Sequence, residues 1–149
     1  ILNCRYNLPL VRLYADYVYY PLDVEKMREG AQYLLGTHDF IAFSTAGGQQ
    51  KTTVRTITDI NISSGLLNPE AEPEEDSREG FRPKMVKITI TGDGFLYNMV
   101  RIIAGTLEKV GLGIYPPEHV KEILESLDRS LSAPKAPARG LTLISVDYL

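Results

Sequence analysis

The sequence predicts an α+β fold in which one antiparallel β-sheet carries its helices on a single face. Three observations support this prediction: neighbouring segments whose apolar residues alternate as in strands, segments whose apolar residues recur at helical spacing, and the order of these segments. With 149 residues, 44% of them hydrophobic, the chain can bury the core of one domain. We therefore interpret residues 1–149 as a single domain.

The first two predicted elements are a strand and a helix. Residues 14–20 are rich in tyrosine, which favours strands, and Pro21 ends the run. Asp23 is a favourable N-cap for the helix that follows, and Gly36 lies just past its expected end. The apolar positions of this helix fall on one stripe: Val24, Met27, Ala31, Leu34 and Leu35.

Two alternating segments, residues 54–62 and 85–91, are predicted to pair as antiparallel strands. The residues between them, 66–83, include six acidic and two basic side chains, hence a local charge of −4. Because the whole chain carries −3, the remainder carries +1. We expect residues 66–83 to form an acidic surface loop, which leaves the rest of the surface compatible with a nucleic-acid partner.

Two more helices and a closing strand complete the prediction. Residues 95–110 place apolar side chains at helical spacing, and residues 117–127 do so again after Pro117, a residue favoured in the first helical turn. Residues 141–148 alternate and predict a strand that closes the sheet. The predicted order of elements is therefore βαββααβ.

Several classes of protein are excluded by what the sequence lacks. No apolar run approaches the roughly 20 residues of a membrane-spanning helix, and the N-terminal residues show no signal-peptide pattern. The single cysteine, Cys4, cannot form an internal disulfide, and the two histidines, His38 and His119, form no metal-binding pattern with it. We expect a cytoplasmic protein with no metal site and no membrane partner.

Residue types alone indicate three candidate sites, each with a purely structural alternative. Residues 92–95 form a glycine-rich turn that could present N–H groups to a ligand or could be only a tight connection. Arg101 shares a helix face with Ala104 and Gly105, so a close neighbouring segment could partly desolvate its guanidinium, although most helical arginines are surface residues. Residues 136–141 could shape a binding wall or could simply enter the last strand.

Read together, these segments resemble the tRNA pseudouridine synthase A family, and the residues of its motifs resemble those of the bacterial branch. The similar stretches occur in the family's order and cover nearly all of the chain outside residues 66–83. They are residues 22–27 and 35–44, Val54-Arg55-Thr56-Ile57, Gly92-Asp93-Gly94-Phe95-Leu96-Tyr97-Asn98-Met99-Val100-Arg101 continuing to residue 111, and residues 128–148 with Ala136-Pro137-Ala138-Arg139-Gly140-Leu141.

The resemblance implies an isomerase that converts uridine to pseudouridine in the anticodon stem-loop of tRNA, without metal or organic cofactor. Such enzymes use an aspartate nucleophile, and the target base leaves the helical stack before the reaction. Arg101 matches the family's arginine that pairs with this aspartate, a role that would give a partly buried guanidinium its anionic partner.

The resemblance also implies residues that bind the substrate. Gly140 and Leu141 match the loop that lies against the target base. Phe95 and Met99 are candidates for lining the same pocket, although core packing explains them equally well. Arg55 is a candidate either for binding an RNA phosphate or for a structural ion pair.

The sequence departs from the family pattern where the nucleophile is concerned. The Arg-Thr-Asp motif that carries the aspartate is absent. The chain begins at a motif, Ile1-Leu2-Asn3, that matches the middle of the family's sequences. We therefore expect a C-terminal half that is inactive alone, with tRNA, the missing N-terminal half and a second copy in a homodimer as partners. Two alternatives remain: a non-catalytic RNA-binding or dimerisation module, and an unrelated α+β fold that binds a small molecule at residues 92–95.

Overall fold

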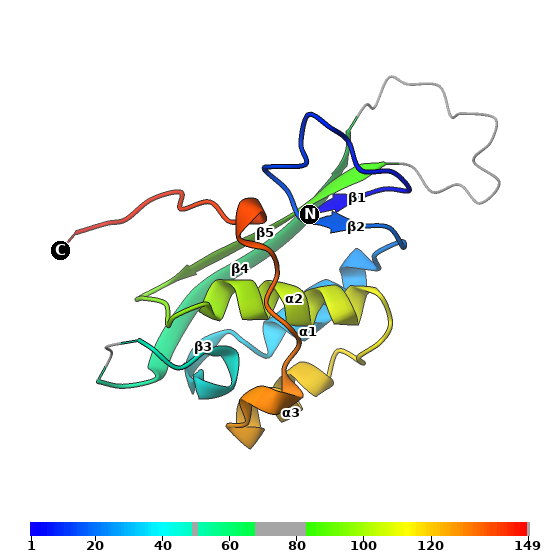
Figure 1. Cartoon of the computed structure of the whole chain (residues 1–149). Helices are drawn as coiled ribbons and strands as arrows, with labels where there is room; N and C mark the ends of the chain where they lie inside the picture. Colours follow the sequence, from blue (N-terminus) through cyan, green and yellow to red (C-terminus); the bar gives the residue numbers. More distant parts are fainter. Residues whose placement is uncertain (49–50, 68–82, 149) are drawn as a thin grey trace.

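The computed structural model describes residues 1–48, 51–67 and 83–148, and its centre is a five-stranded sheet (Figure 1). The strand order is β2-β1-β5-β4-β3. The strands are β1 (Leu2–Asn3), β2 (Tyr17–Val18), β3 (Gly36–Asp39), β4 (Val54–Leu66) and β5 (Lys84–Gly92). All neighbouring strands pair antiparallel except β1 and β2, which are parallel.

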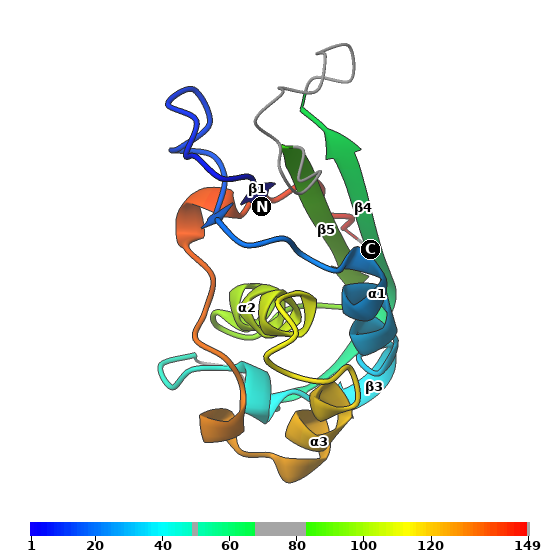
Figure 2. The same ribbon diagram turned by 90° about the vertical axis from the view of Figure 1, so that its right-hand side faces the viewer.

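Three α-helices lie on one side of the β4–β5 ribbon, as the two views in Figures 1 and 2 show. They are α1 (Val24–Gln32), α2 (Met99–Gly111) and α3 (His119–Ser126). The predicted α+β class, with helices on one face of a mainly antiparallel sheet, is confirmed. Short 3-10 turns accompany them: η1 (Ile41–Phe43), η2 (Arg129–Leu131) and η3 (Ala138–Gly140).

The β4–β5 pair explains an irregularity in the sequence pattern. The register shifts between Ile57 and Asp59, which marks a β-bulge, and then continues regularly with Ile60 opposite Ile90. The bulge changes the parity of the strand, so Ile57, Ile60 and Ile62 are all buried despite their uneven spacing. The predicted antiparallel pair is confirmed, whereas the predicted acidic loop lies outside the described residues between 68 and 82.

Capping bonds and backbone dihedral angles determine where the helices begin. The Asp23 carboxylate accepts a hydrogen bond from the Lys26 backbone N–H at 3.1 Å, which confirms the predicted N-cap of α1. Helix α2 begins at Met99 rather than at residue 95, because Asn98 has a left-handed backbone with φ of 61°. Helix α3 begins at His119, two residues later than predicted, after a turn through Pro117.

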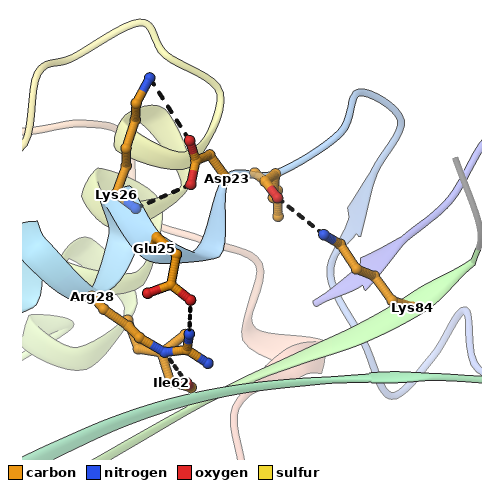
Figure 3. Close-up of polar contacts among 7 residues, drawn as sticks. Asp23, Glu25, Lys26, Arg28, Ile62 and Lys84 are labelled. Carbon is orange, nitrogen blue, oxygen red and sulfur yellow. Dashed lines mark hydrogen bonds and ion pairs between the residues drawn. The ribbon is translucent and has the colours of Figure 1, made fainter. Parts of the chain in front are cut away.

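Side chains of α1 and β5 fix this helix and the chain before it to the sheet (Figure 3). The Nε of Arg28 donates to the carbonyl of Ile62 on β4 at 2.8 Å, and another nitrogen of the same guanidinium pairs with Glu25. The Nζ of Lys84 on β5 donates to the carbonyl of Leu22 at 3.0 Å. The core lies between the sheet and the helices and includes Met27, Phe40, Phe43, Met99, Ile102, Ile103 and Leu107.

Two of the predicted strands were wrong in extent or existence. The strand predicted over residues 14–20 is reduced to Tyr17–Val18, because residues 11–15 form turns closed by backbone bonds such as Ala15 N–H to Val11 C=O. The closing strand predicted over residues 141–148, called the tail below, is irregular and exposed, because it has no strand partner among the described residues. Alternation indicates which side chains suit burial but supplies no partner.

The sequence patterns also missed two strands. Strand β1 is only two residues long, and β3, Gly36–Asp39, is polar and lacks an alternating pattern. Within the described ranges, no helix has the length and apolar character needed to cross a bilayer.

Candidate active site

A small cavity of about 80 Å³ lies between β5, α2 and the chain that follows α3, and we call it the cleft. Strand β5 contributes an apolar wall, and α2 contributes one charged and two small or apolar residues. The lining residues include Val86, Ile88, Ile90, Val100, Arg101, Ala104, Ala136, Pro137, Gly140 and Leu141. The cleft therefore brings together three of the site residues that the sequence predicted: Arg101, Gly140 and Leu141.

Arg101 lies in the first turn of α2 and is half-buried. Its Nε donates to the carbonyl of Ala136 at 2.8 Å, and its Nη1 donates to the side-chain oxygen of Asn98 at 3.1 Å. Both acceptors are uncharged. Among the residues that the structure describes, no carboxylate lies within 4.0 Å of this guanidinium.

Asn98 explains how Arg101 is aimed. Its left-handed backbone starts α2 at the next residue, which places Arg101 in the first turn. Its side-chain nitrogen donates to Thr45 Oγ1 at 2.8 Å while its oxygen accepts from Arg101. The amide group therefore connects Arg101 to the loop after η1 and restricts the orientation of the guanidinium.

The chain after α3 reaches α2 because of a glycine. A Cβ atom added to Gly105 would lie 2.1 Å from the carbonyl oxygen of Pro134, a distance that no real contact permits. The close approach lets the Ala136 N–H donate to the carbonyl of Arg101 at 2.9 Å, opposite the bond from Arg101 Nε to Ala136. The prediction that small residues on this helix face admit a neighbouring segment is confirmed at Gly105.

Gly140 and Leu141 also line the cleft, at the end of η3. Gly140 packs against the backbone of Asp16, since an added Cβ would lie 3.0 Å from the Asp16 nitrogen. Leu141 is 49% exposed and lines the cleft with the apolar side chains of β5. Apolar side chains thus line the same cleft as Arg101.

The other predicted site residues lie elsewhere. Met99 is fully buried in the core, where its sulfur accepts a hydrogen bond from the Leu96 N–H. Phe95 is 36% exposed and does not line the cleft. The Nη1 of Arg55 donates to the carbonyl oxygens of Thr52 and Val54, so it forms no ion pair among the described residues.

The turn at residues 92–95 is a tight connection. An added Cβ at Gly92 would lie 2.6 Å from the carbonyl oxygen of Thr56, and the Asp93 carboxylate accepts a hydrogen bond from the Thr56 N–H at 2.9 Å. The glycine at position 92 is therefore explained by the close approach of β5 to the backbone of β4. In the described part of the chain, no group of three or more His, Cys, Asp or Glu side chains is placed to hold a metal ion.

Two residues near the cleft were missed by sequence reasoning. Asn98 stands inside the phrase that carries the family resemblance, but nothing in its type predicts a bond to Arg101. Asp16 also lines the cleft and is only 7% exposed. Its only signal in the sequence was a single acidic residue within an aromatic and apolar run, residues 14–20, which was predicted as a strand without a site.

Asp16, which lines the cleft, forms a carboxyl pair with Glu108 of α2. Burial raises the pKa of the Glu108 carboxyl above its ordinary value, and the hydrogen-bonded carboxyl of Asp16 raises this pKa further. Lys109, whose Nζ lies 3.6 Å from Glu108 Oε1, acts in the opposite direction. The Asp16 carboxylate thus opposes ionisation of Glu108, because two adjacent negative charges repel each other.

The outer edge of β5 is only partly paired. Strand β1 pairs with β5 at Met85 and Lys84, and Ile1 exchanges hydrogen bonds with Val86. Beyond Val86, β5 has no further strand partner on this edge among the described residues. The cleft thus lies beside an open sheet edge and an exposed tail.

Comparison with known proteins identifies the family. A family model described as tRNA pseudouridine synthase matches residues 31–149. The chain is 42% identical over 148 residues to tRNA pseudouridine synthase A of Thermoanaerobacter sp. (strain X514) and 43% identical to that of Acetivibrio thermocellus, covering 99% of this chain and 54% of each relative. It is 45% identical to tRNA pseudouridine synthase A 2 of Clostridium perfringens, with the same coverage. The chain spans about half the length of these relatives, and it belongs to the tRNA pseudouridine synthase family.

Proposed function

We propose that this chain is the C-terminal half of an enzyme that isomerises uridine to pseudouridine in the anticodon stem-loop of tRNA. One observation carries the proposal: the half-buried guanidinium of Arg101 lines a cleft with Gly140 and Leu141 and has no carboxylate within 4.0 Å among the described residues. A desolvated guanidinium is stabilised by an anionic partner. We assign that partner to an aspartate nucleophile supplied from outside residues 1–149.

The geometry of Arg101 suits this role. A guanidinium has five N–H donors, of which two bind Ala136 and Asn98. The three remaining donors, on Nη1 and Nη2, can bind a carboxylate end-on with two parallel bonds. This contact would keep the aspartate ionised and aimed while the glycosidic C–N bond breaks, the uracil rotates and the C–C bond forms.

The apolar side of the cleft would receive the target base. The base must leave the RNA stack before the reaction, and Leu141 and Gly140 would then limit its freedom and exclude water. Met99 would contribute only indirectly, by packing in the core against which α2 lies, since its side chain is fully buried. Phe95 and Arg55 lie at the turn formed by residues 92–95, where an exposed ring and a guanidinium can contact RNA.

The size of the cleft supports a site completed by another part of the enzyme. Ligand pockets usually measure roughly 300–1,000 Å³, whereas the cleft holds about 80 Å³. We propose that the N-terminal half of the same enzyme covers the free edge of β5 and the exposed tail. We further propose that the intact enzyme is a cytoplasmic homodimer that acts on tRNA without a cofactor.

Substitution of Arg101 in the full-length synthase tests the proposed function. Arg101→Ala should lower the rate of pseudouridine formation by about a thousandfold or more, while tRNA binding stays within about twofold. Arg101→Lys should restore little activity, because an ammonium lacks the planar fork. Arg28→Ala is the matched control, since Arg28 bonds to Ile62 away from the cleft. Wild-type turnover in Arg101→Ala would contradict the role assigned to Arg101, whereas a full-length wild type that binds tRNA without forming pseudouridine would favour a non-catalytic RNA-binding or dimerisation module.

The isolated chain provides an independent test. Residues 1–149 alone should form no detectable pseudouridine in tRNA, and addition of the N-terminal half should restore turnover. Near full-length turnover from the isolated chain would contradict the assignment of the nucleophile to another segment.

A further inference from the structure

Residues 133–140, called the crossing segment below, run from η2 past α2 towards β1, as the orange to red ribbon in Figure 2 shows. At the α2 end the segment is fixed by the paired bonds between Arg101 and Ala136. The Ala133 N–H also donates to Thr106 Oγ1 at 3.3 Å. The bonds at the α2 end belong to the site already described. Leu141 directly follows the other end, so the contacts of that end determine where Leu141 enters the cleft.

The other end is fixed by residues distant in sequence. The Nε of Arg139 donates to the carbonyl of Ala15 at 3.0 Å, across 124 positions of the chain. The Nη2 of the same side chain lies 4.0 Å from Asp16 Oδ1. Gly140 then packs directly on the Asp16 backbone. Two successive residues of the crossing segment therefore contact the turn before β2.

Asp16 is suited to hold a cation in place. Its carboxylate is mostly buried, and its Oδ1 also accepts the Tyr17 N–H at 2.8 Å, which fixes the side-chain orientation. The titratable side chains around it are Arg139 and Glu108, the latter with its neighbour Lys109. Arg139 is the only one of these that belongs to the crossing segment.

We infer that Asp16 is a positioning residue for the proposed pseudouridine synthase reaction: through Arg139 it fixes the crossing segment so that Gly140 and Leu141 face the target base opposite Arg101. The inference rests on the proposed function. Asp16 lines the same cleft, but its carboxylate lies more than 4.0 Å from the Arg101 guanidinium and pairs with Arg139. Its role is therefore separate from that of the proposed nucleophile.

Loss of this contact should affect the reaction more than the binding of RNA. A displacement of about 1 Å in a group that orients a substrate can lower a rate by about a hundredfold. The bulk of tRNA binding depends on phosphate contacts spread over a large surface. Weakening the Asp16–Arg139 contact should therefore lower kcat and leave KM nearly unchanged, whereas loss of a direct phosphate contact would raise KM.

The test uses four variants of the full-length synthase, assayed for kcat and KM of pseudouridine formation on tRNA: Arg139→Ala, Asp16→Asn, the double variant and Arg139→Lys. We expect Arg139→Ala and Asp16→Asn each to lower kcat about ten- to a hundredfold with KM within about twofold. The double variant should be no worse than Arg139→Ala alone, because that substitution already removes the contact with Asp16 together with the bond to the Ala15 carbonyl. Arg139→Lys, which keeps a cation, should recover part of kcat.

Lys135→Ala is the matched control, because Lys135 is an exposed cation of the same segment with no bond to any described residue. It should keep wild-type kcat and KM. The inference is overturned if Arg139→Ala behaves like Lys135→Ala, if its effect is on KM alone, or if the two single effects add in the double variant. Should Asp16→Asn fail to fold, Arg139→Ala and Arg139→Lys decide the question, since Arg139 is half-exposed.

The outcomes also separate this inference from the proposed function. An active wild type that loses turnover in Arg101→Ala but not in Arg139→Ala would contradict only the positioning role. A wild type without pseudouridine formation would contradict the proposed function itself.

Discussion

The crossing segment and the tail are consecutive in sequence but differ in how they are held. Residues 133–140 are fixed to α2 by hydrogen bonds at Ala133 and Ala136 and to residues 15–16 by Arg139 and Gly140. Residues 141–148 have alternating apolar side chains, yet Leu143 is 76% exposed and Val146 is 53% exposed. The segment with the better strand pattern thus finds no strand partner among the described residues.

This difference shows that polar anchoring and close backbone approach, rather than hydrophobic pattern, determine which of the two segments is ordered against the domain. An apolar alternation stabilises a strand only when a neighbouring strand supplies its backbone hydrogen bonds.

The largest effect is expected from breaking the close approach of the crossing segment to α2. Gly105→Ala introduces a Cβ that would meet the Pro134 carbonyl at 2.1 Å, so the backbone must move apart. We expect a loss of about 3 kcal/mol in the free energy of unfolding, measured by urea denaturation. Gly65→Ala, where no atom lies within 4 Å of the added Cβ, should change it by less than about 0.5 kcal/mol. Equal effects of the two substitutions would contradict the close-approach argument.

A smaller effect is expected from removing one anchoring hydrogen bond. Thr106→Val keeps the side-chain shape but deprives the Ala133 N–H of its acceptor at a position that is 1% exposed. This change should cost about 1–2 kcal/mol in urea denaturation. The control is Thr58→Val, whose exposed hydroxyl bonds to the Thr91 carbonyl and should matter little. If both valine variants unfold at the same urea concentration, the buried bond contributes nothing specific.

The carboxyl pair formed by Asp16 and Glu108 predicts a pH-dependent effect. The pKa of Glu108 is raised in the folded state, so its contribution to stability is complete below its ordinary value of 4.5 and is lost as pH rises through the folded pKa. Glu108→Gln, which resembles the protonated acid, should therefore be more stable than wild type at pH 7 and equal to it at pH 4. Urea midpoints at the two pH values measure this, and a difference independent of pH would count against it.

The smallest effect is expected in the tail. Leu143→Ala should change the free energy of unfolding by less than about 0.5 kcal/mol, because the side chain is 76% exposed. The same chemical change at the fully buried Leu107 should cost about 2–5 kcal/mol and serves as the control. In the full-length enzyme Leu143→Ala should cost more than in the chain alone, and an equal cost would argue against coverage of the tail.

Much of the fold could be predicted because its elements carry their own signals. Asp23 caps α1 as its type indicates, and β4 and β5 pair as their alternation predicts. The start of α2 could not be predicted, since residues 95–98 continue the helical spacing and only the left-handed backbone of Asn98 interrupts it. The tail was predicted wrongly because a single-chain pattern cannot show whether the partner strand is present.

The candidate site was only partly predictable for a related reason. Small residues near Arg101 indicated that another segment approaches α2, and Gly105 does contact the Pro134 carbonyl region. The resemblance then grouped Arg101 with Gly140 and Leu141, which line one cleft. The contact between Asp16 and Arg139 escaped notice because it spans more than 120 positions, although Arg139 belongs to the candidate segment 136–141.

The position of Arg101 in the first turn of α2 has an electrostatic consequence for whatever anion docks there. The free N–H groups at the start of a helix carry a partial positive charge of roughly half a unit, and no acidic residue in the first turn of α2 offsets it. This field adds to the charge of the guanidinium and favours the ionised form of an approaching carboxyl group. A nucleophile seated at this end of the helix would therefore stay charged in solutions more acidic than a free aspartate tolerates.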